Sequence, residues 1–142
     1  MPNLLLPTIL DVGTVSATRG EISSEETMNR VGLITGASRG LGADLAGFLA
    51  KRGYDLVLTA RGSEGLEATA RPLEQFGGRI VAIVGDVSDP EHRSRLAKAA
   101  ESIGGLDLLV NNASHLGLSP LLPLAEYPLE AIERVLQVNL IA

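Results

Sequence analysis

The stretch "GLITGASRGLGADLA", residues 32–46, joins a short apolar run to a helical pattern through a turn rich in glycine. Its glycines Gly36, Gly40 and Gly42 each suit a different need of a phosphate-binding turn. The first permits a tight turn, the second lets the backbone approach a pyrophosphate without an intervening Cβ, and the third lets a helix pack close to the strand. The free N–H groups of a helix that begins near Leu41 would point at that anion. The stretch therefore predicts a strand, a phosphate-binding turn and a helix.

The spacing of these glycines leaves a simpler interpretation open. It follows GxxxGxG, whereas the usual dinucleotide-binding pattern is GxGxxG. A glycine-rich turn could also merely connect a strand to a helix. A kinase-type P-loop is excluded, because no Gly-Lys-Ser/Thr follows the turn.

Length and composition limit the classes of protein that need to be considered. The 142 residues, of which 45% are hydrophobic, are expected to form one compact domain. The 12 basic and 17 acidic side chains give a net charge of -5, which argues against a nucleic-acid partner. The absence of cysteine excludes disulfides, thiolate metal sites and a cysteine nucleophile, and it fits a reducing compartment.

The histidines and the apolar segments carry no sign of a metal or a membrane. His92 and His115 lie far apart and belong to no pattern such as HExxH, so we interpret both as ordinary surface or loop residues and expect no metal site. The apolar opening is interrupted by Pro7, lacks the basic region of a secretory signal, and no stretch approaches the ~20 apolar residues of a membrane span. We therefore expect a soluble, cytoplasmic protein.

Residues 1–29 differ from the remainder of the chain. They mix Gly, Ser, Thr and Glu without a sustained period, which is typical of a flexible leader. Met28 stands just before the first expected strand, so an upstream start codon and a regulatory or targeting extension are both open explanations. Residues 30–142 are then the folded domain.

After the leader, apolar runs alternate with helical patterns. The expected strands are residues 30–35, 54–60, 79–87 and 106–113. The expected helices are residues 41–53, 63–78, 91–105 and 128–142. Strands that are apolar nearly throughout and alternate with helices predict a parallel sheet covered on both faces. The fold class is therefore α/β, a doubly wound, Rossmann-like sheet with four strands in the order 3-2-1-4 and a ligand crevice at the carboxyl ends of strands 1 and 4.

Particular side chains refine the expected helices. The packed face of the first helix is expected to consist of Leu41, Leu45, Phe48 and Leu49, and that of the second of Leu66, Ala70, Leu73 and Phe76. Pro72 should bend or interrupt the second helix. Asp89 and Pro90 form a good N-cap and first-turn pair for the third.

Four motifs resemble those of the classical short-chain dehydrogenase/reductase family. They are "TGASRGLG" (35–42), "GDVSD" (85–89), "LVNNAS" (109–114) and "VNL" (138–140), and they occur in the order and spacing of that family over residues 30–142. A site for another nucleotide, such as S-adenosylmethionine, is an alternative in which the second and third motifs have no place.

The resemblance implies a set of cofactor-binding residues. Those expected around the phosphates and ribose are Gly36, Ser38, Arg39, Gly40 and Leu41, with Gly42 packing the helix against the strand. Asp86 and Val87 would hold the adenine, and Asn112 and Ala113 would lie beside the adenosine and the central ribose. Ser114 departs from the family's more frequent Gly at that position.

The end of the second strand favours NADP over NAD. An NAD-preferring site needs a carboxylate there, roughly 20 residues after the turn, to accept from the 2′-hydroxyl. Thr59, Ala60 and Arg61 occupy this place, and Asp55 lies at the other end of the strand. The guanidinium of Arg61 offers donors suited to a 2′-phosphate, and Arg39 adds a second cation. A solvated loop charge is the alternative for Arg61.

The catalytic residues of the family are largely missing from this sequence. The family uses a Tyr as acid or base, a Lys four residues later, a Ser, and an Asn on the helix after strand 4, which aligns with Asn139. The tyrosines here are Tyr54 and Tyr127, and neither is followed by Lys four residues later. A solvated or capping role is the alternative for Asn139.

The resemblance implies the cofactor-binding half of an NADP(H)-dependent oxidoreductase. The complete parent would reduce a ketone or aldehyde, or oxidise the alcohol, and these 142 residues alone are expected to be inactive. The alternative is a non-catalytic NADP-binding or interaction module, and a continuing reading frame with Ser and Tyr-x-x-x-Lys would favour the enzyme. The resemblance leaves a homo-oligomer open, because members of this family commonly form dimers and tetramers. The edge position of strand 4 also predicts marginal stability or self-association.

Overall fold

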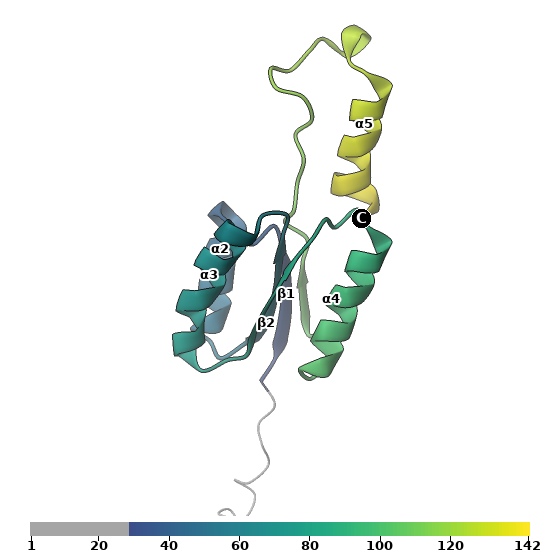
Figure 1. Ribbon diagram of the computed structural model, residues 1–142. Coiled ribbons are helices and arrows are strands. Elements are labelled where there is room, and N and C mark those ends of the chain that lie inside the picture. Colours follow the sequence, from purple (N-terminus) through teal and green to yellow (C-terminus); the bar gives the residue numbers. More distant parts are fainter. Residues whose placement is uncertain (1–28) are drawn as a thin grey trace, which may run out of the picture.

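The computed structural model describes residues 29–142, so the predicted leader lies outside the described residues except for Asn29. Its strands form one parallel sheet (Figure 1). They are β1 (Val31–Thr35), β2 (Asp55–Ala60), β3 (Ile80–Val84) and β4 (Leu108–Val110). The order in the sheet is β3-β2-β1-β4, which confirms the predicted order. The carboxyl ends of β1 and β4 are therefore neighbours at the point where the order reverses.

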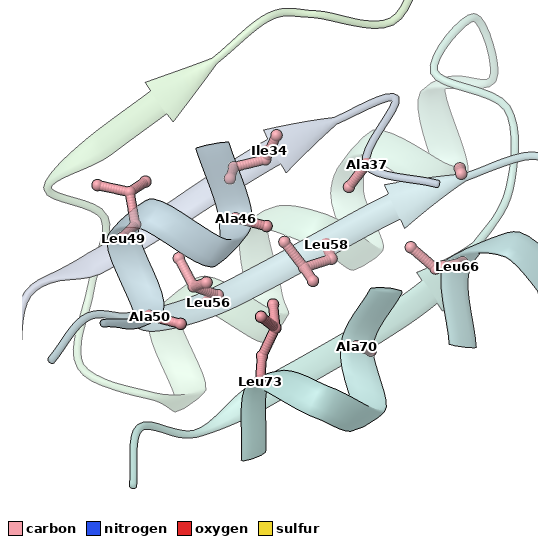
Figure 2. Packing of buried hydrophobic residues seen from close by; sticks show 11 residues of the cluster. Ile34, Ala37, Ala46, Leu49, Ala50, Leu56, Leu58, Leu66, Ala70 and Leu73 are labelled. Carbon is pink, nitrogen blue, oxygen red and sulfur yellow. The ribbon is translucent and has the colours of Figure 1, made fainter. Parts of the chain in front are cut away.

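Helices cover both faces of this sheet, as Figure 1 shows. On one face lie α2 (Gly40–Ala50) and α3 (Ser63–Ala70), and on the other lies α4 (Pro90–Ser102). Successive residues of a strand point to opposite faces. Ile34 accordingly joins the cluster under α2 and α3, which Figure 2 shows, while Leu33 joins the cluster under α4. The central strands are buried on both sides, which is why their sequences are apolar nearly throughout.

The local signals for helix ends act as expected. α3 ends at Ala70, and Pro72 lies in the 3-10 turn η2 (Arg71–Phe76) that follows. The carboxylate of Asp89 accepts a hydrogen bond of 2.9 Å from the backbone N–H of Glu91, so it caps α4. Both expectations are confirmed.

The packed face predicted for the first helix is wrong in part. The buried residues of α2 are Gly42, Ala46, Leu49 and Ala50, whereas Leu41 and Phe48 are 65% and 50% exposed. The reason is the close approach of helix and strand, since a Cβ at Gly42 would lie 2.4 Å from the carbonyl oxygen of Gly36. Small side chains are needed at such an approach. Phe48 lies instead under the guanidinium of Arg52, which is 3.4 Å from the centroid of its ring.

The last part of the chain lies beyond the carboxyl end of the sheet. After β4, a long connection with the 3-10 turn η3 (Leu124–Glu126) leads to α5 (Leu129–Leu136), which continues as the π-helical segment η4 (Gln137–Ile141). Figure 1 shows α5 above α4, outside the two helical layers. The two outer strands are shorter than expected, and the residues that follow them form loops at the carboxyl edge. Within residues 29–142, no helix has the length and apolar character needed to cross a membrane.

Candidate functional site

A cavity of about 410 Å³ opens at the carboxyl edge of the sheet. Five segments line it: the turn after β1, the end of β2, the loop after β3, the loop after β4, and η4. Among its lining residues are all the predicted cofactor-binding residues except Gly42. These are Gly36, Ser38, Arg39, Gly40, Leu41, Arg61, Asp86, Val87, Asn112 and Ala113. The structure thus brings together residues that are up to 77 positions apart in the sequence, such as Gly36 and Ala113.

The glycine turn has the geometry that its sequence suggested. Gly36 has a φ of 69°, and a Cβ there would lie 2.9 Å from the Cα of Ala113, so no other residue fits without a shift. Gly40 has a φ of 57° and would meet no atom within 4 Å, so it faces open space. No side chain caps the start of α2. Its first N–H groups are therefore suited to an anion in the cavity.

A hydrogen-bond network connects this turn to the end of β4. The amide Nδ2 of Asn112 donates to the carbonyl oxygens of Thr35 and Gly36, each at 3.1 Å. The hydroxyl of Thr35 accepts from the backbone N–H groups of Asn112 and Ala113, each at 3.0 Å. The two strands that flank the reversal point are thus held together at the cavity wall. The side-chain amide of Asn112 serves the turn itself, which is a use that the sequence did not reveal.

Asp86 is an ionised acceptor on the cavity wall. Its Oδ1 accepts from the backbone N–H of Ser88 at 2.9 Å and from its hydroxyl at 2.7 Å, and its Oδ2 pairs with the guanidinium of Arg134. Burial alone would raise the pKa of this carboxyl, but the bonds from Ser88 and the charge of Arg134 outweigh it and lower the pKa. No sequence pattern pointed to Arg134, which lies on α5, 48 residues from Asp86.

Both predicted cations line the same cavity. Arg39 precedes α2, and Arg61 follows directly after β2. Asp55 lies at the opposite end of β2, where it accepts from the backbone N–H of Arg79 at 2.7 Å and from its Nε at 2.6 Å. Asp86 is therefore the single carboxylate among the described residues that line the cavity. The end of β2 presents an arginine to the cavity, and no acid.

The expectation of a surface or loop position is wrong for His92. Its side chain lies on the first turn of α4 with 0% exposure, and its Nε2 is 2.8 Å from the hydroxyl of Thr59. Gly85 makes room for the ring, because a Cβ there would lie 2.2 Å from the Nδ1 of His92. The pattern of apolar residues on α4 gave no sign that a histidine would face inward. His115 does lie in the loop after β4, as expected.

Asn139 lies on η4 and connects this segment to the loop after β4. Its Oδ1 accepts from the backbone N–H of His115 at 2.8 Å, and its Nδ2 donates to the carbonyl oxygen of the same residue at 3.0 Å. It lines a second cavity of about 360 Å³, next to the first, and not the first cavity itself. In residues 29–142, no group of three or more His, Asp or Glu side chains is placed to hold a metal ion.

A parallel sheet with a glycine turn and a cavity at its reversal point defines a Rossmann-like α/β protein, an architecture typical of dinucleotide-binding domains. Comparison with known proteins gives the family. The family model for short chain dehydrogenases matches residues 30–142, and the chain belongs to this family.

The relatives that this chain matches are longer proteins. L-rhamnose 1-dehydrogenase (NAD(P)(+)) from a Sphingomonas species is 36% identical over 110 residues, which are 76% of this chain and 42% of that protein. A metagenomic short-chain oxidoreductase in complex with NADP has a TM-score of 0.71 and 34% identity, covering 79% of this chain and 50% of that one. NAD+-bound xylitol dehydrogenase has a TM-score of 0.71 and 29% identity, covering 82% and 45%. The chain thus spans half or less of the length of these relatives.

Proposed function

We propose that the cavity at the carboxyl edge binds NADP(H), and that the chain supplies the cofactor-binding part of an oxidoreductase that reduces a ketone or aldehyde, or oxidises the alcohol. One observation carries the choice of cofactor. Arg39 and Arg61 line one cavity, while the end of β2 holds no carboxylate that would accept from a 2′-hydroxyl. The relatives include both an NADP complex and an NAD+ complex, and the pair of arginines supports NADP over NAD.

Each wall of the cavity is assigned a part of the dinucleotide. The start of α2 would face the pyrophosphate, because its N–H groups and helix dipole favour an anion there. Arg39 and Arg61 would hold the 2′-phosphate through charge-assisted hydrogen bonds. Asp86 would accept from the adenine amine, with Val87 against the ring, while Asn112 and Ala113 would lie beside the adenosine and central ribose.

When bound, NADP(H) would supply or accept the hydride. The protein must also move a proton, and a phenol with a pKa near 10 does so poorly at neutral pH unless a cation lowers its pKa. The 142 residues contain no Tyr followed four residues later by Lys. Asn139 holds the loop at His115 and is assigned a positioning role beside the site. The lack of a Tyr-x-x-x-Lys pattern in these 142 residues favours a second candidate function for the chain alone, a module that binds NADP without turnover.

The cofactor assignment is tested by titrating the purified protein with NADPH and NADH while following the nicotinamide fluorescence. We expect saturable binding that favours NADPH, and about tenfold weaker NADPH binding in Arg39→Ala and in Arg61→Ala, since hydrogen bonds to charged groups contribute about 1.5–3 kcal/mol. Arg71→Ala is the matched control, because Arg71 is exposed and does not line the cavity. Equal affinity for both cofactors, or an equal effect of all three substitutions, would overturn the assignment.

An assay of turnover with the same purified protein distinguishes the two candidate functions, oxidoreductase and non-catalytic NADP-binding module. A panel of ketones and aldehydes is incubated with NADPH, and the loss of the nicotinamide absorbance is measured. Binding without turnover supports the module for this chain, whereas turnover that is lost in Asn139→Ala supports the enzyme. The absence of both binding and turnover would contradict both candidates.

A further inference from the structure

His92 is the buried titratable group that the cofactor assignment leaves without a role. It is fully buried on the first turn of α4, beneath the cavity. Its neighbours are the hydroxyl of Thr59, 2.8 Å from Nε2, and the guanidinium of Arg95, 3.1 Å from Nδ1. The backbone of Gly85 lies against the ring, because a Cβ there would come within 2.2 Å of Nδ1. Two of these three neighbours, Thr59 and Gly85, line the cavity.

The partners of the ring define where its proton lies. A guanidinium has donors and no acceptor, so Nδ1 must accept the bond from Arg95. A neutral imidazole carries one N–H, which is then on Nε2 and donates to the hydroxyl oxygen of Thr59. A doubly protonated ring would direct an N–H at the N–H of Arg95 and would place two cations side by side.

Thr59 connects this histidine to the rest of the cavity wall. Its carbonyl oxygen accepts the backbone N–H of Ala37, in the glycine turn, at 3.0 Å. The next carbonyl, that of Ala60, accepts the N–H of Gly85, also at 3.0 Å. The end of β2 therefore joins the glycine turn, the loop before Asp86 and the first turn of α4. Arg61 extends directly from this junction.

We propose that His92, as the neutral ring protonated on Nε2, is a positioning residue of the nucleotide cavity: it fixes Thr59 and thereby the end of β2 from which Arg61 reaches the 2′-phosphate. This proposal rests on the proposed function, because it assigns His92 to the cavity that binds NADP. Protonation of Nδ1 places the imidazolium against the guanidinium of Arg95, and this repulsion displaces the ring from Thr59. The affinity for the phosphorylated cofactor therefore falls as the pH is lowered.

The burial of the ring and the charges around it also favour the neutral form of His92. Burial, and after it the charge of Arg95, lower the pKa of His92 below its ordinary value of 6.5, while Asp89 and Asp86 act in the opposite direction. Asp86 is itself paired with Arg134, and Asp89 caps α4. The ring is therefore neutral at neutral pH, and its contribution to the site is lost as the pH falls from 6.5 through the folded-state pKa.

The test compares the affinity for NADP+ of the wild-type protein and His92→Gln by calorimetry, from about pH 8 to about pH 5, which spans the ordinary histidine pKa. The amide nitrogen of Gln reaches the position of Nε2 and donates a hydrogen bond, but it does not titrate. We expect similar affinities at the upper end of the pH range, and at the lower end a larger loss of affinity in the wild type than in His92→Gln. The 2′-phosphate itself titrates near pH ~6, but it does so equally in both proteins.

His115→Gln is the matched control, because His115 is the other histidine of the chain and lies in the loop after β4. It should keep the wild-type pH profile. Parallel profiles for wild type and His92→Gln would overturn the proposal, as would a flat profile in His115→Gln. Thr59→Val, which removes the hydroxyl while keeping the shape, is the second variant and should weaken NADP+ binding at both ends of the pH range.

Nuclear magnetic resonance of the ring nitrogens separates failure of this proposal from failure of the proposed function. In the ligand-free protein we expect the proton of His92 on Nε2, and amide signals of Arg61 and Gly85 that shift as His92 titrates. A proton on Nδ1, or amide signals that do not follow the titration, would overturn the positioning role whether or not a nucleotide binds. A wild-type protein that binds no nucleotide at any pH, with these signals as expected, would instead refute the proposed function.

Discussion

Gly42 and Gly47 lie on the same helix but meet different surroundings. A Cβ at Gly42 would lie 2.4 Å from the carbonyl oxygen of Gly36, whereas one at Gly47 would meet no atom within 4 Å. The first glycine is thus required by the close contact between α2 and the turn that forms the cavity floor. The second serves no contact, and its missing side chain only weakens the helix.

This difference predicts opposite effects of the same substitution. Gly42→Ala should lower the free energy of unfolding by about 1–3 kcal/mol, because the helix must move away from the turn. Gly47→Ala should raise it by about 0.5–1 kcal/mol through helix propensity. Urea denaturation followed by circular dichroism measures both. Equal effects of the two substitutions would contradict the close-packing argument.

At the scale of single residues, the sequence predicted those features that depend on the local backbone geometry. The three glycines of the turn were found because their spacing encodes backbone requirements that the structure confirms at Gly36 and Gly42. The burial of His92 and the pairing of Arg134 with Asp86 were missed, because each depends on a segment distant in sequence. No periodicity within one element reports such contacts.

At the scale of elements, the amino end of β2 is held by one buried carboxylate. Asp55 is 1% exposed and accepts from the side chain of Asn29 at 3.1 Å, as well as from the backbone and side chain of Arg79. Burial would raise its pKa, but these donors outweigh it, and the pKa is lowered below 3.8. The contribution of Asp55 to stability is therefore fully present above pH 3.8 and is lost as the pH falls through the folded-state pKa.

Removing this carboxylate should destabilise the sheet. Asp55→Ala leaves the backbone N–H of Arg79 without its acceptor, and we expect a loss of about 1–3 kcal/mol in the free energy of unfolding at neutral pH. Asp44→Ala, at an exposed position of α2, is the control and should change it by less than about 0.5 kcal/mol. Urea denaturation gives both values. If the two variants were equally stable, Asp55 would have no structural role.

Elements were predicted well where the chain carries its own stop and start signals. Pro72 and Asp89 marked the end of α3 and the start of α4 because each acts through its own backbone or side chain. The face of α2 was predicted incorrectly, since hydrophobic spacing ignores how closely a glycine lets the helix approach the sheet. Phe48 was assigned to the core for that reason, and it lies outside it.

At the scale of the whole molecule, β4 is an edge strand of the described sheet. The side chain of Leu109 on this strand is 51% exposed. The apolar side chains of Leu140 and Ile141, in η4, are 76% and 63% exposed. An edge with apolar side chains is a template for association with another copy.

This arrangement predicts that the 142-residue chain self-associates as its concentration rises. Leu109→Lys should reduce the association, because a charge on an edge strand opposes pairing. Leu116→Lys, at a loop position with 86% exposure, is the control and should have a smaller effect. Sedimentation velocity over a range of concentrations measures this. A monomer at every concentration, with a sharp and reversible thermal transition, would contradict the prediction.

The whole-molecule arrangement was the most predictable part of the site. Because a doubly wound sheet brings the carboxyl ends of its strands to one edge, the crevice at the ends of β1 and β4 could be predicted from the order of the elements in the sequence. The sequence did not allow us to predict the contacts of His92 with Thr59 and Gly85. These contacts depend on how α4 packs against the end of β2.

The central claim is that this cavity recognises a 2′-phosphate through Arg39 and Arg61. Calorimetric titration with adenosine 2′,5′-bisphosphate and with adenosine 5′-monophosphate tests it most directly, because the two ligands differ only in that phosphate. We predict at least about tenfold tighter binding of the bisphosphate, consistent with one or two charge-assisted hydrogen bonds, and the loss of this preference in the Arg39→Ala, Arg61→Ala double variant. Equal affinities in the wild-type protein, or a preference that survives in the double variant, would contradict the claim.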